Sequence, residues 1–270
     1  MVIWSTLEAS CPMCEHRTRL REVGSGFTIG QDSDLLVRMR GKHIIQAEIH
    51  TCHRCHYSGY ARDFLRDVSP AQKNRFLEIV SPVLLEASLL GAAPGMAVEA
   101  RTGGRSGFEK TPLPDVQYYW SYKSAEALAL PPMLQGERLL RAYWCLRLPP
   151  SSHLPPRVHQ ALGRIYLKGA IGKLRQGLRF ETNPNWVYLV AELCRRNKNF
   201  LLASRYYRRF LEQPGGAGYL KLAARKLSLL ADARESKDLS MEETLYDKAP
   251  DAPRGHRGDP DEEGTSRDAG

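Results

Sequence analysis

The chain has 270 residues, of which 42% are hydrophobic and 26% charged, a composition typical of a folded protein with one or two domains. No stretch approaches the roughly 20 consecutive apolar residues that span a bilayer. The first ten residues contain neither the basic segment nor the apolar run of a signal peptide. We therefore expect a soluble, cytoplasmic protein that does not enter the membrane.

Two pairs of cysteines are the most informative feature of the N-terminal part. Cys11 and Cys14 are separated by two residues, and so are Cys52 and Cys55. Each C-x-x-C turn, or knuckle, places two thiolates close enough to share a metal ion, and two knuckles supply the four soft ligands of a closed, tetrahedral zinc site. The spacing therefore predicts one structural Zn²⁺ in a zinc-ribbon-like module formed by residues 1–66.

Other interpretations of these cysteines stay open at this point. A C-x-x-C pair can be redox-active, and two pairs can form two disulfides in an exported protein. The segment Cys52–His56 also has the C-x-x-C-H spacing of a c-type haem attachment site. A histidine could replace one of the cysteine ligands, and the candidates adjoin the two knuckles: His16, His50, His53 and His56.

Short β-prone runs lie between the two knuckles and are separated by glycine-containing turns. The runs are Leu20–Val23, Phe27–Ile29, Leu35–Met39 and Ile44–Ile49. They predict a small antiparallel sheet between the knuckles. Asp32 and Asp34 alternate along one strand edge and could bind a cation, although a turn-capping or solvent-facing role is the favoured interpretation.

Helical signals begin after the second knuckle. Ser69–Gln72 combines an N-cap serine, a proline suited to the first helical position and a capping-box glutamine. Pro82 is expected to begin a second helix. The Gly- and Pro-rich segment from Gly91 to Asp115 predicts a long loop. Residues 67–116 therefore form a connector of helices and loop.

Apolar residues recur at helical spacing through residues 117–233, which predicts a helical domain. The expected helices are Tyr122–Leu130, Gln135–Leu146, Val158 towards Phe180, Trp186–Arg196, Phe200–Glu212 and Tyr219–Ala233. Cys145 and Cys194 lie within these apolar patterns and are expected to be core residues. Residues 234–270 are polar, charged and poor in large aliphatic residues, so we expect a disordered acidic tail.

Part of the helical domain is similar to a tetratricopeptide repeat, in which small residues let two helices approach and aromatic residues interlock. The matching positions are Val190, Ala191, Phe200, Ala203 and Tyr207 and, upstream, Leu162, Gly163 and Tyr166. An ordinary helical hairpin predicts the same packing. The expected fold is mainly α, with tetratricopeptide-like helical hairpins and a small N-terminal β module.

Together these segments resemble a family of uncharacterised bacterial proteins, domain of unknown function 2225. The matching segments are Cys11–Cys14, Gln31–Leu35, Cys52–Tyr60, Arg141–Trp144 and Tyr188–Arg196. Family members usually have a glycine after the second cysteine of each knuckle, where Glu15 and His56 stand here. The resemblance implies zinc binding and a helical scaffold, and it implies no activity.

No combination of residues in the sequence predicts catalysis. It contains no P-loop, no GxGxxG before a helix and no GxSxG nucleophile elbow, and four cysteines would fill the coordination shell of the zinc ion. We therefore expect a zinc-stabilised interaction scaffold or adaptor without enzymatic activity. A nucleic-acid-binding protein is the alternative, and a redox or haem-binding C-x-x-C protein is a lesser one.

Positive charge is concentrated in the helical domain. The formal net charge of the chain is +9, yet residues 234–270 carry −5 from six basic and eleven acidic residues. Residues 150–230 carry +12, from fifteen basic and three acidic residues. The zinc module is nearly neutral, unlike a zinc ribbon that reads nucleic acid.

The basic helical surface is expected to bind an acidic segment of a partner protein, with nucleic acid as the alternative partner. The candidate partner-binding residues are Arg195, Arg196, Lys198, Arg205, Arg208 and Arg209. Tyr206 and Tyr207 could stack on bases if the partner is a nucleic acid. The sequence does not determine the oligomeric state.

Overall fold

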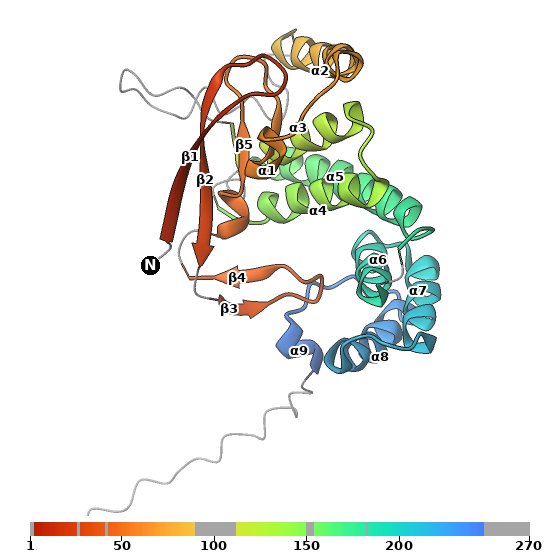
Figure 1. The fold of residues 1–270 in the computed structure, drawn as a ribbon. Helices are drawn as coiled ribbons and strands as arrows, with labels where there is room; N and C mark the ends of the chain where they lie inside the picture. Colours follow the sequence, from red (N-terminus) through yellow and green to blue (C-terminus); the bar gives the residue numbers. More distant parts are fainter. Residues whose placement is uncertain are drawn as a thin grey trace, which may run out of the picture.

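A computed structural model describes residues 3–25, 28–40, 43–89, 112–149, 154–181 and 183–245. The protein is mainly helical, with small antiparallel strand pairs in the N-terminal part, as the sequence predicts. Figure 1 shows the strands on one side of the molecule and the helices α4 to α8 on the other. No helix in the described ranges combines the length and the apolar composition that crossing a membrane requires.

The β part consists of antiparallel hairpins. β1 (Ile3–Ser10) pairs with β2 (Arg17–Ser25), β3 (Thr28–Gln31) with β4 (Val37–Met39), and β5 (Ile49–Thr51) with β6 (Ser58–Tyr60). Within the described residues each pair is a separate two-stranded sheet. The prediction of one sheet between the knuckles is therefore wrong, because each knuckle is the turn of its own hairpin.

The run Ile44–Ile49 is also not a continuous strand. Ile44–Gln46 forms a short 3-10 helix, and only Ile49 enters β5. A short apolar run does not distinguish a buried strand from a helical turn by itself.

The helices follow in the order predicted by the apolar periodicity. They are α1 (Ala61–Phe64), α2 (Pro70–Leu89), α3 (Pro114–Ala127), α4 (Pro132–Leu146), α5 (Pro156–Gly177), α6 (Pro184–Arg196), α7 (Phe200–Glu212), α8 (Gly218–Asp232) and α9 (Met241–Leu245). The start of α7 agrees with the prediction, whereas α3 begins eight residues earlier than expected.

Prolines set the beginning of several helices. Proline has a fixed φ and lacks an N–H group, which suits the first helical position, where that N–H has no partner. The helices α2 to α6 all begin in this way, at Pro70, Pro114, Pro132, Pro156 and Pro184. These residues therefore start helices instead of only separating them.

The connector differs from its prediction in two respects. α2 continues through Pro82 to Leu89, so the expectation that Pro82 begins a new helix is wrong. A proline inside a helix removes one backbone hydrogen bond and does not have to end the helix. Most of the expected loop from Gly91 to Asp115 lies outside the described residues, and α3 already begins at Pro114.

Two hydrophobic clusters stabilise the described body. The larger one is formed mainly by α4 to α8, with the aromatic residues Tyr188, Tyr207 and Phe210 fully buried. It also contains Cys145 and Cys194, which confirms that both are core residues. The smaller cluster lies beneath the two knuckles and joins them to α2 and α3.

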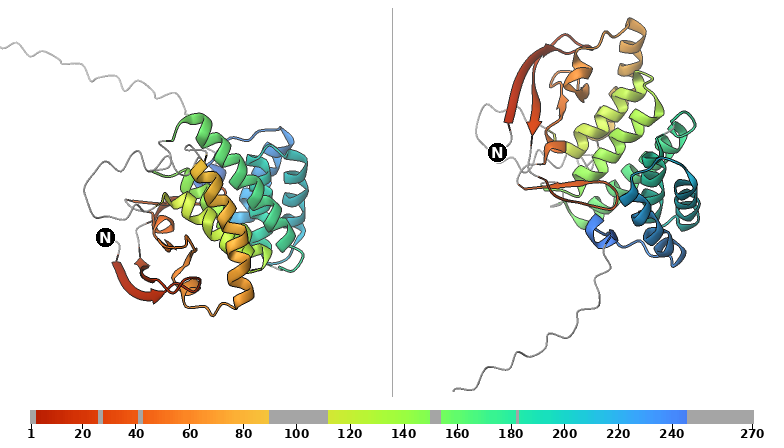
Figure 2. Two further views of the ribbon diagram at one scale, coloured as in Figure 1. Left: turned by 90° about the horizontal axis from the view of Figure 1, so that it is seen from above. Right: turned by 60° about the horizontal axis from the view of Figure 1, so that its bottom comes forward.

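The β3–β4 hairpin lies against the helical half of the molecule. Figures 1 and 2 show it beside α9, turned away from β1 and β2. Asp32 forms an antiparallel bridge with Ser240, and the Ser33 N–H donates to the Leu239 carbonyl at 3.0 Å. A part of the expected N-terminal module therefore contacts the C-terminal part of the chain directly.

Residues 234–245 belong to the folded body, so the expectation of disorder from residue 234 onwards is wrong for them. The Arg195 guanidinium donates to the carbonyl oxygens of Glu235 and Lys237 at 3.0 and 2.9 Å. The Met241 side chain in α9 is buried. This segment is fixed by backbone carbonyls that satisfy a buried cation, a contribution that side-chain composition does not show.

We expect removal of residues 234–245 to destabilise the protein. A chain that ends at Ala233 lacks both carbonyl partners of Arg195, and hydrogen bonds to charged groups contribute about 1.5–3 kcal/mol each. Its Tm should fall by about 10 °C, because 1 kcal/mol corresponds to roughly 2–4 °C in a chain of this size. A chain that ends at Leu245 keeps these contacts and is the control. Thermal unfolding compares the two, and equal Tm values would contradict this role.

Candidate metal centre

The two knuckles have the same backbone geometry. Cys11–Cys14 connects β1 to β2, and Cys52–Cys55 connects β5 to β6. The N–H of Cys11 donates to the His16 carbonyl, and the N–H of Cys52 donates to the Tyr57 carbonyl, both at 2.8 Å. The carbonyls of Cys11 and Cys52 each accept a further hydrogen bond of 2.8 Å from the residue that follows the second cysteine.

Those following residues have left-handed backbone conformations. Glu15 has a φ of 63° and His56 a φ of 60°. Glycine is the residue that adopts this conformation most readily, and a residue with a Cβ adopts it at a small energetic cost. The knuckle turns are formed here without glycine at these positions.

The four cysteine sulfur atoms lie together, all within 4.8 Å of one another. The Sγ atoms of Cys11 and Cys55 are 3.5 Å apart, and those of Cys14 and Cys52 are 3.6 Å apart. Tetrahedral coordination with metal–sulfur bonds of about 2.3 Å places sulfurs about 3.8 Å apart. The donor set therefore fits one metal ion, and all the cysteines are free of disulfide bonds.

Protons compete with a metal ion for these sulfurs. Without a cation, the contact with Cys52 raises the pKa of the Cys11 thiol to about 12. Hydrogen bonds with Cys11 and Cys52 likewise raise the pKa of Cys55, because they hold the proton on its sulfur. A bound cation would displace these protons and stabilise four thiolates together.

The nearby histidines have other contacts. The His50 ring lies 2.9 Å from the Arg21 carbonyl oxygen, and burial lowers the pKa of His50. The His56 ring contacts the Trp120 ring edge-to-face, with centroids 4.9 Å apart. In the described part of the chain, the group of side chains able to hold a metal consists of the four cysteines alone.

The metal centre is anchored to the helices. Cys11 and Cys52 have no exposed surface and belong to the same cluster as Tyr57 and Phe76. The cluster includes Leu128, which follows the last turn of α3. Burial of two ligands against this cluster holds the sulfurs in position from the protein side.

A second polar site, a buried ionic cluster, contains Asp32 and Asp34. The Arg147 guanidinium donates to Asp34 at 2.6 Å and to Asp32 at 2.5 Å. Arg38 donates to Asp32 at 2.7 Å, and the Trp144 indole N–H donates to Asp34 at 3.1 Å. Both carboxylates are buried and neutralised by arginines. The favoured solvent-facing role is therefore wrong, and arginines stand where the alternative placed a bound cation.

Glu192 lies at the centre of this ionic cluster. Its carboxylate accepts hydrogen bonds from Arg195 at 2.8 Å, from Arg196 at 2.9 Å, and from the hydroxyls of Ser33 and Tyr207 at 2.6 Å. Burial alone would raise the pKa of Glu192, but the hydrogen bond from Arg195 and the charges of both arginines lower it below its usual value. Glu192 is therefore held in its ionised form.

These contacts correct the prediction that Arg195 and Arg196 lie on an exposed basic surface. Arg195 is 0% exposed and Arg196 is 8% exposed, because both neutralise the buried Glu192. Tyr207 is also fully buried and cannot stack on bases. The other predicted partner-binding residues are exposed: Lys198, Arg205, Arg208 and Arg209.

The sequence did not indicate a role for Arg147, whose guanidinium group contacts both Asp32 and Asp34. It lies at the end of α4, 113 residues from Asp34. No local pattern indicates that these two positions meet. A basic residue just after a helix is common, because it interacts favourably with the C-terminal carbonyls.

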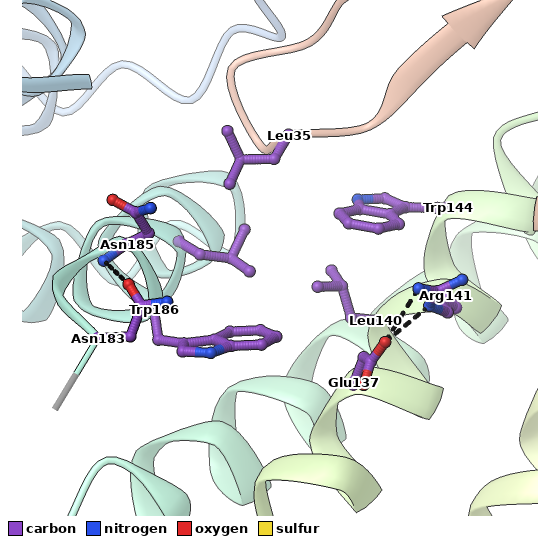
Figure 3. Close-up of a pocket in the computed structure, with 9 residues that line it drawn as sticks. Leu35, Glu137, Leu140, Arg141, Trp144, Asn183, Asn185 and Trp186 are labelled. Atoms are coloured by element: carbon purple, nitrogen blue, oxygen red, sulfur yellow. Dashed lines mark hydrogen bonds and ion pairs between the residues drawn. The ribbon is translucent and has the colours of Figure 1, made fainter. Parts of the chain in front are cut away.

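A hollow of about 260 Å³ opens next to the ionic cluster. Figure 3 shows Leu35 above a space that Trp144 of α4 and Trp186 of α6 border. Glu137 and Arg141 form an ion pair of 3.0 Å at one side. This tryptophan hollow is mainly apolar with a polar margin, a lining typical of sites for apolar groups.

The fold and the cysteine cluster define a helical protein with a potential four-cysteine metal centre. The sequence profile of a family described as an uncharacterized protein conserved in bacteria, DUF2225, matches residues 5–240. The chain therefore belongs to this family, and the match includes part of the C-terminal segment that packs against Arg195. Comparison with curated proteins and with solved structures finds no match.

We expect the purified protein to contain one equivalent of a thiolate-bound metal ion. Cys52→Ser should lose it, whereas Cys194→Ala, which changes a buried cysteine outside the cluster, should retain it. Elemental analysis measures the metal, and the indole N–H signal of Trp120 in NMR spectra reports the loss through its contact with His56. Acidification should also release the metal, because protons compete for the thiolates. Equal metal content in both variants would contradict this ligand set.

We expect Glu192→Gln to lower the free energy of unfolding by about 3 kcal/mol, because it leaves two buried guanidinium groups without their carboxylate. Glu212→Gln, in an exposed position of α7, is the control and should change it by less than about 0.5 kcal/mol. Urea unfolding measures both.

Because the pKa of Glu192 is lowered in the folded state, its contribution to the free energy of unfolding is present above the usual glutamate pKa and is lost as the pH falls through the lowered value. The variant should lack this part of the acid dependence.

Proposed function

We propose that the protein is a zinc-stabilised helical scaffold without catalytic activity, which binds an acidic segment of a partner protein. The observation that carries this proposal is the set of exposed basic residues on and before α7. These residues are Lys198, Arg205, Arg208 and Arg209, and none of them forms an ion pair with a residue in the described ranges. Exposed, unpaired cations attract an acidic partner and orient it as it associates.

The ligand chemistry supports zinc as the metal and a structural role for it. Four thiolates at these separations suit tetrahedral Zn²⁺. A closed thiolate shell has no open position for an activated water, which a catalytic zinc ion requires. The site would then stabilise the knuckles in a reducing compartment such as the cytoplasm, where cysteines stay free.

The packing of α6 and α7 supports the interaction role. Ala191 and Ala203 are fully buried, and Tyr188 and Tyr207 interlock edge-to-face with ring centroids 6.3 Å apart. Tetratricopeptide-like hairpins use small and aromatic residues in this way and present concave surfaces to peptides. The tryptophan hollow offers such a concave surface.

Nucleic-acid binding is the second candidate function. Arg205, Arg208 and Arg209 are exposed along α7, and the partly exposed Tyr206 lies between them. Arginines on one helix can contact successive phosphates, and a tyrosine can stack on a base. The burial of Tyr207 removes one of the two aromatic residues that this alternative invoked.

A charge reversal on α7 tests the proposal. The triple variant Arg205→Glu, Arg208→Glu and Arg209→Glu should lose proteins that co-purify with the wild type. The control reverses three exposed basic residues outside α7, on α5, in the turn after α5 and on α8: Lys168, Arg179 and Arg225. Affinity purification with mass spectrometry measures both variants, and equal loss in both would contradict a specific surface on α7.

A salt titration separates the two candidate partners. Phosphate binding releases counterions, so affinity for DNA or RNA should fall steeply with salt if α7 binds nucleic acid. For a protein scaffold, we expect only weak nucleic-acid binding at physiological salt. Submicromolar affinity for nucleic acid under those conditions, lost in the α7 variant, would establish the alternative.

A further inference from the structure

A second hollow, of about 350 Å³, lies between α4, α5 and the end of α6. We call it the basic hollow, because its lining contains four cations and one carboxylate. The charged residues are Arg147, Arg164, Arg196, Lys198 and Asp238. We infer that the basic hollow binds an oxyanion group, a carboxylate or a phosphate, and that the acidic partner segment supplies it; the source of the group rests on the proposed function.

Buried carboxylates hold two guanidinium groups of the basic hollow in place. Arg147 is held by Asp32 and Asp34, and Arg196 is held by Glu192 at 2.9 Å. The side chain of Arg196 is 1% exposed. An arginine held by buried carboxylates loses little side-chain freedom when a further oxyanion binds, and its planar group suits such a ligand.

Arg196 already holds one oxyanion at the hollow. Its Nη1 atom donates to Asp238 at 2.7 Å, and that aspartate side chain is 63% exposed. The contact shows that a carboxylate from the solvent side can reach this guanidinium. The Asp238 carboxylate occupies one N–H group of Arg196 and leaves two cations at the edge of the hollow, Arg164 and Lys198, without a partner among the described residues.

The charges of the hollow and the ionic cluster leave an excess of two cations. The cations are Arg38, Arg147, Arg164, Arg195, Arg196 and Lys198, against the carboxylates of Asp32, Asp34, Glu192 and Asp238. Six cations and four carboxylates give +2. The excess belongs to Arg164 and Lys198, which are exposed and form no hydrogen bond or ion pair through their side chains with any described residue.

Helix ends do not account for these two cations. The C-terminal ends of α4 and α6 lie at the hollow, and their carbonyl groups attract positive charge. The Leu146 carbonyl at the end of α4 is contacted by the His159 ring at 3.0 Å. At the end of α6, the carbonyls of Cys194 and Arg195 accept backbone N–H groups at 2.8 and 2.9 Å.

The backbone of Lys198 provides an independent observation. It has a φ of 59°, at the position after a helix where glycine is the usual residue. A lysine there costs stability relative to glycine, and such strain is commonly found at functional positions. The strained residue holds an ammonium group at the edge of the basic hollow.

A labelled hexaglutamate peptide tests the inference on the full-length, metal-loaded protein. The double variant Arg164→Glu and Lys198→Glu should weaken binding of this peptide about tenfold, as expected from the loss of a charge-assisted hydrogen bond. Arg179→Glu with Arg225→Glu makes the same change of charge at exposed positions outside the basic hollow and outside α7, and is the control. Fluorescence anisotropy measures both. No binding by the wild type, or equal weakening in both variants, would overturn the inference.

Two further measurements make the test independent of folding and of partner identity. Inorganic phosphate should displace the peptide from the wild type, and failure to do so would contradict a discrete oxyanion site. Lys198→Gly should raise the Tm by about 2 °C through relief of backbone strain and should also weaken peptide binding. Unchanged peptide binding in this more stable variant would overturn the role of Lys198. If the peptide binds as expected but no protein co-purifies, only the proposed scaffold function fails.

Discussion

A single buried carboxylate, that of Glu192, determines how distant parts of the chain are joined. A charge without exposed surface costs several kcal/mol unless partners compensate it. Its partners come from α6 itself, from Ser33 between β3 and β4, and from Tyr207 in α7. Arg195 then extends the cluster to the carbonyls of residues 235 and 237. The hairpin, two helices and the C-terminal segment therefore depend on one charge.

The metal centre is the corresponding constraint at the other end of the molecule. Each of its hairpins has only two strands, and isolated two-stranded hairpins are marginally stable on their own. The burial of Cys11 and Cys52 against α2 and α3 supplies one link to the helices. A buried ion pair of 2.7 Å between Asp63 and Arg138 supplies another, to α4. A metal ion would complete a unit that the helices already support.

The distribution of cations shows why charge in a sequence window differs from charge on a surface. Residues 150–230 carry +12, yet Arg195 and Arg196 are buried against Glu192. Both are among the six candidate partner-binding residues that the sequence indicated. Because Arg195 and Arg196 are buried, the exposed positive charge lies on α7 and at the edge of the basic hollow, where Lys198 and Arg164 lie.

Local patterns in the sequence determined the two C-x-x-C knuckles and most of the helices. These features depend on residues a few positions apart, through turn geometry, helical periodicity and prolines such as Pro132 at helix starts. The tertiary structure alone decided that Asp34 meets Arg147, that Arg195 is internal, and that residues 234–245 are folded. A buried charge must find partners wherever the folded chain brings them, and here such partners lie up to 163 residues apart.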